Sequence, residues 1–280
     1  MNTRFALYSR PRPSVASWYE VIDEAAGLGM THIEGFTNWE LAEPNPEAAR
    51  KLRAYADKKS IRFCCLSCYC NFSLENTQAQ LLRMKGFVDV AAILGSPYFH
   101  HTIVAGYPTP KPVLYNWDAL FNNAISAIRI LFDYAQKQNI RLIYENQGYM
   151  FNGVRNYGKF LDAVDRDVGV LLDMGNNYNV DEPLDAFLEA YRDRICHVHI
   201  KDVLYGSTPE GMPDSLQTLN GNYFWPVAAG CGIMPLERYI TSLEKGGYTG
   251  FYSLEYGSPT DDSPLLDNSI ETLRGYLSKN

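Results

Sequence analysis

Eight short apolar segments alternate with longer segments in which apolar positions recur every three or four residues. The apolar segments show little polar alternation, which is typical of strands that are covered on both faces. We expect strands at Arg4–Ser9, His32–Phe36, Ile61–Tyr69, Tyr98–Val104, Arg141–Gln147, Val168–Met174, Ile195–Val203 and Gly250–Tyr256. We expect helices at Ser14–Leu28, Pro46–Lys59, Thr77–Leu94, Trp117–Gln138, Tyr157–Val164, Leu184–Arg194, Leu236–Lys245 and Pro264–Ser278.

This order of strands and helices predicts a parallel sheet, because each helix carries the chain back to the start of the next strand. Eight such units match a closed (β/α)8 TIM barrel of the α/β class. The main alternative is an open doubly wound sheet, which usually has a glycine-rich turn after its first strand. The segment SRPRPS after the first expected strand has no glycine. With no linker-like stretch in the sequence, we predict a single domain over residues 1–280.

Two connections that follow strands are unusually long, Ala105–Asn116 and Leu204–Pro235. Loops of this length are usually functional or disordered, and in a barrel both would lie on the face that carries active sites. The second connection contains Tyr223, Phe224 and Trp225, which favours an ordered lid. It ends in Gly-Cys-Gly at 230–232, which we interpret as a turn rather than a phosphate site.

Composition and charge narrow the classes of function. The net charge is −7 and the basic residues are scattered, which disfavours a nucleic-acid partner. No apolar run is long enough to span a bilayer and no secretory signal pattern is visible, so we expect a cytoplasmic protein without a membrane partner. Cys65 and Cys68 have C-x-x-C spacing, but no second pair follows. Strand parity predicts that Cys64, Cys68 and Cys70 share one face and that Cys65 lies on the other, as buried small apolar residues.

Residues that can bind a divalent cation stand near the ends of four expected strands. They are Glu145, Asp173, His197 with His199, and Glu255. The carboxyl ends of parallel barrel strands meet at one mouth, so these side chains are expected to share one ion. Each has a structural alternative: a carboxylate can cap a helix or form an ion pair, and His197 can be a core or supporting histidine. Three acids turned into one mouth would repel one another without a neutralising cation or proton, which favours one divalent ion such as Mn²⁺, Mg²⁺, Co²⁺, Fe²⁺ or Zn²⁺.

The order and spacing of these motifs resemble the xylose isomerase-like TIM-barrel superfamily of sugar and sugar phosphate isomerases and epimerases, which includes D-tagatose 3-epimerase and inosose dehydratase. The resemblance covers essentially the whole chain. Its motifs are E-N at Glu145, D-x-G-N from Asp173 to Asn176, H-V-H-I-K-D from His197 to Asp202, and L-E at Glu255. The resemblance implies that one divalent ion is held by Glu145, Asp173, His199 and Glu255.

The resemblance also implies a mechanism. The ion would chelate the carbonyl oxygen and the neighbouring hydroxyl of an open-chain ketose, which acidifies the proton on the carbon between them. One carboxylate would remove this proton to give a cis-enediolate, and another would return a proton from the opposite face. Glu145 and Glu255 are the candidates for this acid/base pair. The predicted activity is therefore isomerisation or epimerisation of a small sugar or polyol ketone.

Further residues are candidates for contacts with the substrate. They are Glu34, Cys68, His101, Asn176, His197 and Trp225. Glu34 resembles a family position near the site, and one of the adjacent pair His100 and His101 is expected to line the pocket. Lys201 would point out of the pocket if its strand were regular, so an ion pair and a substrate contact remain alternatives there.

Three positions depart from the ketose 3-epimerases, in which Glu, His and Arg stand where this chain has Phe151, Asn176 and Tyr205. Two alternatives therefore stay open. One is a lyase resembling inosose dehydratase, in which the same intermediate expels a hydroxyl as water; the other is a sugar-binding relative without turnover. An endonuclease of a related fold is disfavoured, because its three-zinc chemistry needs more than the five histidines present. The aromatic residues of the long loop are compatible with a homo-oligomer.

Overall fold

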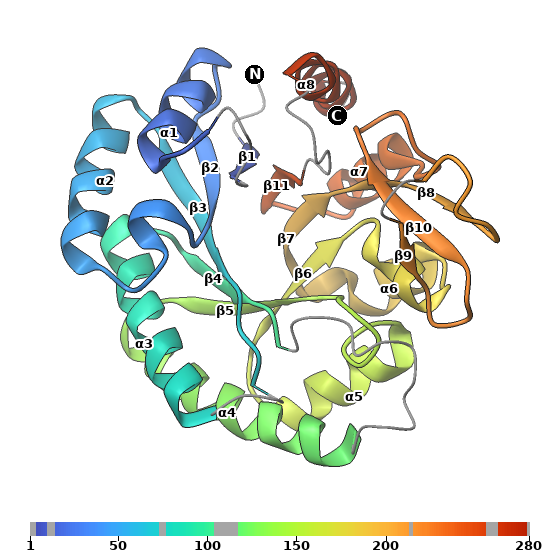
Figure 1. Cartoon of the computed structure of the whole chain (residues 1–280), viewed down its shortest axis with the longest axis horizontal. Helices are drawn as coiled ribbons and strands as arrows, with labels where there is room; N and C mark the ends of the chain where they lie inside the picture. Colours follow the sequence, from blue (N-terminus) through green and yellow to red (C-terminus); the bar gives the residue numbers. More distant parts are fainter. Residues whose placement is uncertain are drawn as a thin grey trace.

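Eight parallel strands close into a barrel with the order β1-β11-β7-β6-β5-β4-β3-β2, which confirms the predicted fold (Figure 1). The computed structural model describes residues 4–9, 15–72, 77–103, 117–212, 215–255 and 263–278, so the expected loop at 105–116 lies outside the described residues. The barrel strands are β1 (Phe5–Ser9), β2 (His32–Phe36), β3 (Arg62–Cys68), β4 (Tyr98–His101), β5 (Arg141–Glu145), β6 (Gly169–Asp173), β7 (Ile195–Ile200) and β11 (Phe251–Leu254).

Eight helices form a ring around the barrel (Figure 1). They are α1 (Trp18–Gly27), α2 (Pro46–Lys58), α3 (Thr77–Leu94), α4 (Trp117–Lys137), α5 (Val154–Val164), α6 (Leu184–Tyr191), α7 (Leu236–Lys245) and α8 (Ser263–Ser278), with short 3-10 turns η1 (Trp39–Leu41), η3 (Asn176–Val180) and η4 (Arg192–Arg194).

Capping residues stabilise the ends of two of these helices. The Asn45 side chain accepts the N–H groups of Glu47 and Ala48 at the start of α2. Gly29 has a positive φ of 66° just after α1, as expected of a C-terminal cap.

The barrel strands pack against apolar side chains on both of their faces. A large cluster fills the space between strands and helices, and a small one, consisting of Ala6, Cys64, Cys65, Ile143 and Leu171, fills the barrel interior. Cys64 and Cys65 therefore lie in the same cluster, while Cys68 and Cys70 pack on the helix side, so the predicted division of the cysteines is wrong. The reason is a register shift between β2 and β3 at Ile33 and Glu34, which interrupts the two-residue alternation. All four cysteines are buried, as predicted.

The long connection after β7 forms a small antiparallel sheet with the order β8-β10-β9, which the sequence did not predict. Its strands are β8 (Asp202–Gly206), β9 (Leu216–Gln217) and β10 (Tyr223–Val227), and they lie beside the barrel near α6 and α7 (Figure 1). The expected strand Ile195–Val203 thus divides at Lys201 into β7 and β8. Among the described residues, no helix is both long and apolar enough to cross a membrane.

One buried carboxylate anchors this connection to the barrel. Asp202 accepts the backbone N–H groups of Val203 and Met234 on Oδ1 and those of Gly230 and Gly232 on Oδ2, at 2.9–3.0 Å. A Cβ atom on Gly232 would lie 2.1 Å from Asp202 Oδ1, so only glycine permits this approach. The Gly-Cys-Gly turn therefore wraps a side chain of the protein itself, in agreement with its interpretation as a turn.

We expect Asp202→Ala to destabilise the protein by about 3 kcal/mol or more, because it leaves several N–H groups in a largely buried position without an acceptor. Urea unfolding followed by circular dichroism measures this change. Glu47→Ala is the matched control, since it removes an exposed carboxylate that pairs with Lys51 at the surface, and it should shift the midpoint little. Equal midpoints for the two variants would contradict the anchoring role of Asp202.

Candidate metal centre

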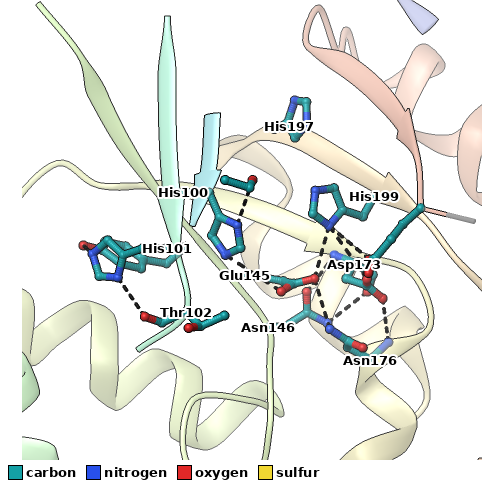
Figure 2. Close-up of polar contacts among 12 residues, drawn as sticks. His100, His101, Thr102, Glu145, Asn146, Asp173, Asn176, His197 and His199 are labelled. Carbon is teal, nitrogen blue, oxygen red and sulfur yellow. Dashed lines mark hydrogen bonds and ion pairs between the residues drawn. The ribbon is translucent and has the colours of Figure 1, made fainter. Parts of the chain in front are cut away.

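Glu145, Asp173, His199 and Glu255 come together at one end of the barrel. Figure 2 shows the first three of them. Glu145 and Asp173 are the last residues of β5 and β6, His199 is next to last in β7, and Glu255 directly follows β11. The register aligns Asp173 with His199 and His199 with Ser253, so side chains from neighbouring strands enter the interior at the same level. One ligand atom from each of the four residues lies within 4.8 Å of the others, and all four residues are buried.

The four residues offer three carboxylate oxygens and one imidazole nitrogen. His199 Nδ1 lies 3.2 Å from Glu145 Oε1, 3.3 Å from Glu255 Oε2 and 3.9 Å from Asp173 Oδ2. Such an oxygen-rich set with one imidazole suits a hard or borderline divalent cation. The donor chemistry, burial and convergence of this cluster are thus consistent with a divalent metal site, although they do not select one metal.

Lys201 is a buried cation within this group. Its Nζ lies 2.8 Å from Asp173 Oδ2, 2.8 Å from Glu255 Oε2 and 3.1 Å from Asn176 Oδ1. The parity of a regular strand would have turned Lys201 outward, but β7 ends at Ile200 and the residue lies between two strands. Lys201 therefore partly neutralises two of the carboxylates.

Neighbouring amides hold the carboxylates in position. Asp173 Oδ1 accepts the N–H groups of Gly175 and Asn176, both at 2.8 Å, which leaves Oδ2 facing the cluster. Asn146 accepts the N–H of Asp173 and donates to its carbonyl oxygen. Asn176, a predicted substrate contact, donates to Glu145 Oε1 at 3.1 Å. The E-N and D-x-G-N motifs thus orient two of the predicted ligands.

Glu34 and His197, which we expected at the substrate, lie on the other side of the His199 ring. Glu34 is completely buried, and its oxygens lie 2.6 Å from His197 Nε2 and 3.0–3.1 Å from His199 Nε2. His197 is completely buried as well. Both residues are therefore placed to support His199 rather than to line an open surface.

The adjacent histidines of β4 face opposite sides (Figure 2). Both histidines line a small cavity together with Glu145 and Gln147, and His100 Nε2 lies 3.8 Å from Glu145 Oε2. His101 instead contacts the Tyr144 hydroxyl at 2.9 Å and the Thr102 carbonyl oxygen at 2.8 Å. Of the two rings, His100 is the one that reaches the cluster.

Cys68 and Trp225 complete the set of expected substrate contacts. Cys68 pairs in register with His101, and both pack into the cluster between strands and helices. Trp225 lies on β10 opposite Leu204, in the sheet beside the barrel. The structure thus brings neither side chain into the group of predicted ligands.

Burial and mutual charge shift the pKa values of the group. Burial would lower the pKa of His199, but the Glu34 and Glu145 carboxylates raise it to about 10. Burial raises the pKa of Asp173, and Lys201 offsets part of this effect. Burial lowers the pKa of His100 to about 3, so this ring is neutral at physiological pH. Without an ion, the carboxylates therefore favour the protonated form of His199, whereas the His100 ring beside them is neutral. An ion bound at one His199 nitrogen would take the place of the proton there.

The chain matches the family model of the xylose isomerase-like TIM barrel over residues 22–276. It is 23% identical to the inosose dehydratase of Serratia proteamaculans (strain 568) over 255 residues, which cover 85% of this chain and 83% of that protein.

Solved structures with the same fold include a xylose isomerase-like TIM barrel protein from Mycobacterium smegmatis in complex with magnesium. Its TM-score is 0.73 and its identity 20%, over 99% of this chain and 97% of that chain. The 3-keto-D-glucoside 4-epimerase of E. coli has a TM-score of 0.75 and an identity of 14%, over 98% of this chain and 100% of that chain.

We expect Lys201→Met to destabilise the chelator-treated protein by about 3 kcal/mol, because the carboxylates beside it lose their ammonium partner. Added Mg²⁺ or Mn²⁺ should recover more stability in this variant than in the wild type, since the ion supplies the missing charge. Thermal unfolding with and without the ion measures both effects, and Lys51→Met is the surface control. An unchanged melting temperature in chelator would contradict the role of Lys201.

Proposed function

The chain belongs to the xylose isomerase-like TIM barrel family, and we propose that it is a divalent-metal-dependent enzyme that removes a proton beside the carbonyl group of a sugar or polyol ketone. The observation that carries this proposal is the convergence of four buried residues, Glu145, Asp173, His199 and Glu255, at the end of the barrel. A magnesium complex of a protein with the same fold is in keeping with such an ion.

Glu145, Asp173, His199 and Glu255 would hold the ion, which when bound acts as a Lewis acid on a carbonyl oxygen. Glu145 and Glu255 are the candidates for moving the proton. They stand on β5 and just after β11, and the intervening strands β6 and β7 carry Asp173 and His199. The two carboxylates therefore flank the other two ligands, as an acid/base pair acting from two sides requires.

Two further groups face this pair. The neutral His100 ring lies beside Glu145 and can accept a hydroxyl proton. Lys201, held between Asp173 and Glu255, would place a positive charge near a substrate oxygen. Together these groups suit a substrate with several hydroxyls around its carbonyl.

The fate of the intermediate separates the candidate activities. Isomerisation or epimerisation follows from returning a proton, and dehydration follows from expelling a neighbouring hydroxyl. Two positions that bind substrate in ketose 3-epimerases make contacts within the protein here. The Phe151 ring stacks on Phe121, and the Tyr205 hydroxyl donates a hydrogen bond to Asp181. Together with the inosose dehydratase relatives, this favours dehydration, with isomerisation or epimerisation as the second candidate.

We expect Glu145→Gln and Glu255→Gln each to slow exchange of the substrate C–H proton with D₂O by about 100-fold or more, because each removes one partner in proton transfer. Mass spectrometry of a ketose and polyol ketone panel measures the exchange, and elemental analysis of each variant shows whether the ion is still bound. Tyr205→Phe is the control and should retain exchange. Full exchange in either Gln variant, or in a metal-free protein, would contradict the proposal.

Product analysis distinguishes the two outcomes. Dehydration lowers the substrate mass by one water, whereas isomerisation and epimerisation leave it unchanged. We expect the loss of water, with one solvent deuterium in the product when a new C–H bond forms. Binding across the panel with no exchange at all would instead identify a sugar-binding protein without turnover.

A further inference from the structure

Glu34 lies at the centre of a hydrogen-bonded group beneath the predicted ligands. Its Oε2 lies 2.6 Å from His197 Nε2, both oxygens lie within 3.1 Å of His199 Nε2, and the Ser67 hydroxyl donates to Oε1 at 2.5 Å. Glu34, Ser67 and His197 are all completely buried. Three groups that can donate a proton therefore converge on its two oxygens: the rings of His197 and His199 and the hydroxyl of Ser67.

A carboxylate surrounded by three such donors accepts from each of them, so each nitrogen that faces Glu34 carries a proton. For His199 this places N–H on Nε2. The only nitrogen left to bind an ion is then Nδ1, which is the atom that faces Glu145, Asp173 and Glu255. Glu34 thus determines which His199 nitrogen can act as the ligand.

Ser67 extends this constraint to a second ring. Its single hydroxyl proton is donated to Glu34, so the contact of 3.2 Å between Ser67 Oγ and His100 Nδ1 requires a proton on Nδ1. The other nitrogen of the His100 ring, Nε2, faces Glu145 at 3.8 Å. One buried carboxylate therefore sets the tautomers of two rings on different strands.

A second metal ion within this group is the alternative, because Glu34, His197 and His199 lie close enough to form a ligand set. The separation of 2.6 Å between Glu34 Oε2 and His197 Nε2 is a hydrogen-bond distance. Two ligands of a tetrahedral zinc ion with bonds of about 2.0–2.1 Å would lie about 3.3 Å apart. The geometry is that of hydrogen bonds.

We propose that Glu34 is a positioning residue that keeps a proton on Nε2 of His199 and, through Ser67, on Nδ1 of His100, so that an ion at the predicted site would meet His199 through Nδ1. The inference rests on the proposed function for the role of the ion, but the hydrogen-bonded group is a property of the chain itself. Glu34 thereby acts through other residues and does not contact the substrate.

Glu34→Gln tests this role, because a glutamine amide offers one acceptor where two histidines present N–H groups. Either His197 or His199 must then move its proton, and we expect Mg²⁺, Mn²⁺ and Co²⁺ to bind about 10–100-fold more weakly. Isothermal titration of the chelator-treated protein measures this affinity. Ile143→Val changes the same barrel interior without touching a polar group, and it should bind the ions as the wild type does.

The imidazole ¹⁵N spectrum of the Mg²⁺-loaded protein reports the tautomers directly, and five histidines make it assignable by single substitutions. In the wild type we expect N–H on Nε2 of His199 and on Nδ1 of His100. Ser67→Ala should release the His100 tautomer while leaving the His199 signal and metal affinity within about threefold of the wild type. Glu34→Gln should alter both rings.

Each outcome bears on one claim. Unchanged metal affinity and unchanged imidazole signals in Glu34→Gln would overturn the inference while leaving the proposed function intact. A wild-type protein that binds no divalent ion would overturn the proposed function. The inference would then be decided by the His100 signal, which requires no ion: N–H on Nε2 of His100 would refute it, and a change in Ser67→Ala would support it.

Discussion

Four carboxylates are buried in one end of this barrel, and their mutual repulsion is the constraint on which the site depends. Glu34, Glu145, Asp173 and Glu255 are each at most 5% exposed. Buried charges of one sign are costly unless cations and hydrogen bonds compensate them. Lys201 and the His199 ring lie among them, and they leave the group with net negative charge. A divalent cation is the simplest addition that would balance it.

His199 divides these acids into two groups with different tasks. On its Nδ1 side lie the three carboxylates that can share an ion, and on its Nε2 side lies Glu34. The first group is held by backbone N–H groups and asparagine side chains, which fix the direction of each carboxylate but add no charge. The second group is closed by hydrogen bonds with His197 and Ser67. The His199 ring thus separates the residues that could hold an ion from the residue that orients this ring.

The sequence predicted the barrel and the convergence of four ligands because both follow from regular alternation. Strand parity determines which side chains enter the interior. The register between strands is strongly specified, because a shift by one residue would turn every buried side chain to the opposite face. The same reasoning failed where alternation is interrupted. The register shift between β2 and β3 placed Cys64 beside Cys65, and the end of β7 at Ile200 turned Lys201 toward the cluster. The sheet beside the barrel was missed because its strands are short and pair with one another only in three dimensions.

The sequence alone could not show which of two adjacent residues faces the barrel interior; the register of the neighbouring strand was needed for that. His100 and His101 have opposite parity, and the sequence could not say which one faces inward. The alignment of Ser67 with His100 and of Cys68 with His101 answers this, since Ser67 reaches Glu34 while Cys68 contacts the helix layer. The sequence also could not predict how deep Glu34 lies in the barrel. A carboxylate near a strand end has the same sequence pattern whether it faces a ligand or is buried below the ligand site.

The motif H-V-H-I-K-D contributes to the histidine pair, to the carboxylate cluster and to the adjacent loop, because the strand ends in the middle of the motif. Within β7, alternation sends His197 and His199 inward to the two sides of Glu34. Because the strand ends at Ile200, the next two residues are released from that alternation: Lys201 reaches the carboxylates and Asp202 gathers the N–H groups of the following loop. Six consecutive residues therefore connect ligand orientation, charge compensation and anchoring of the adjacent sheet. Lys201 and Asp202 are neighbours in the chain, so the residue that compensates charge in the cluster and the residue that anchors the loop share one stretch of backbone.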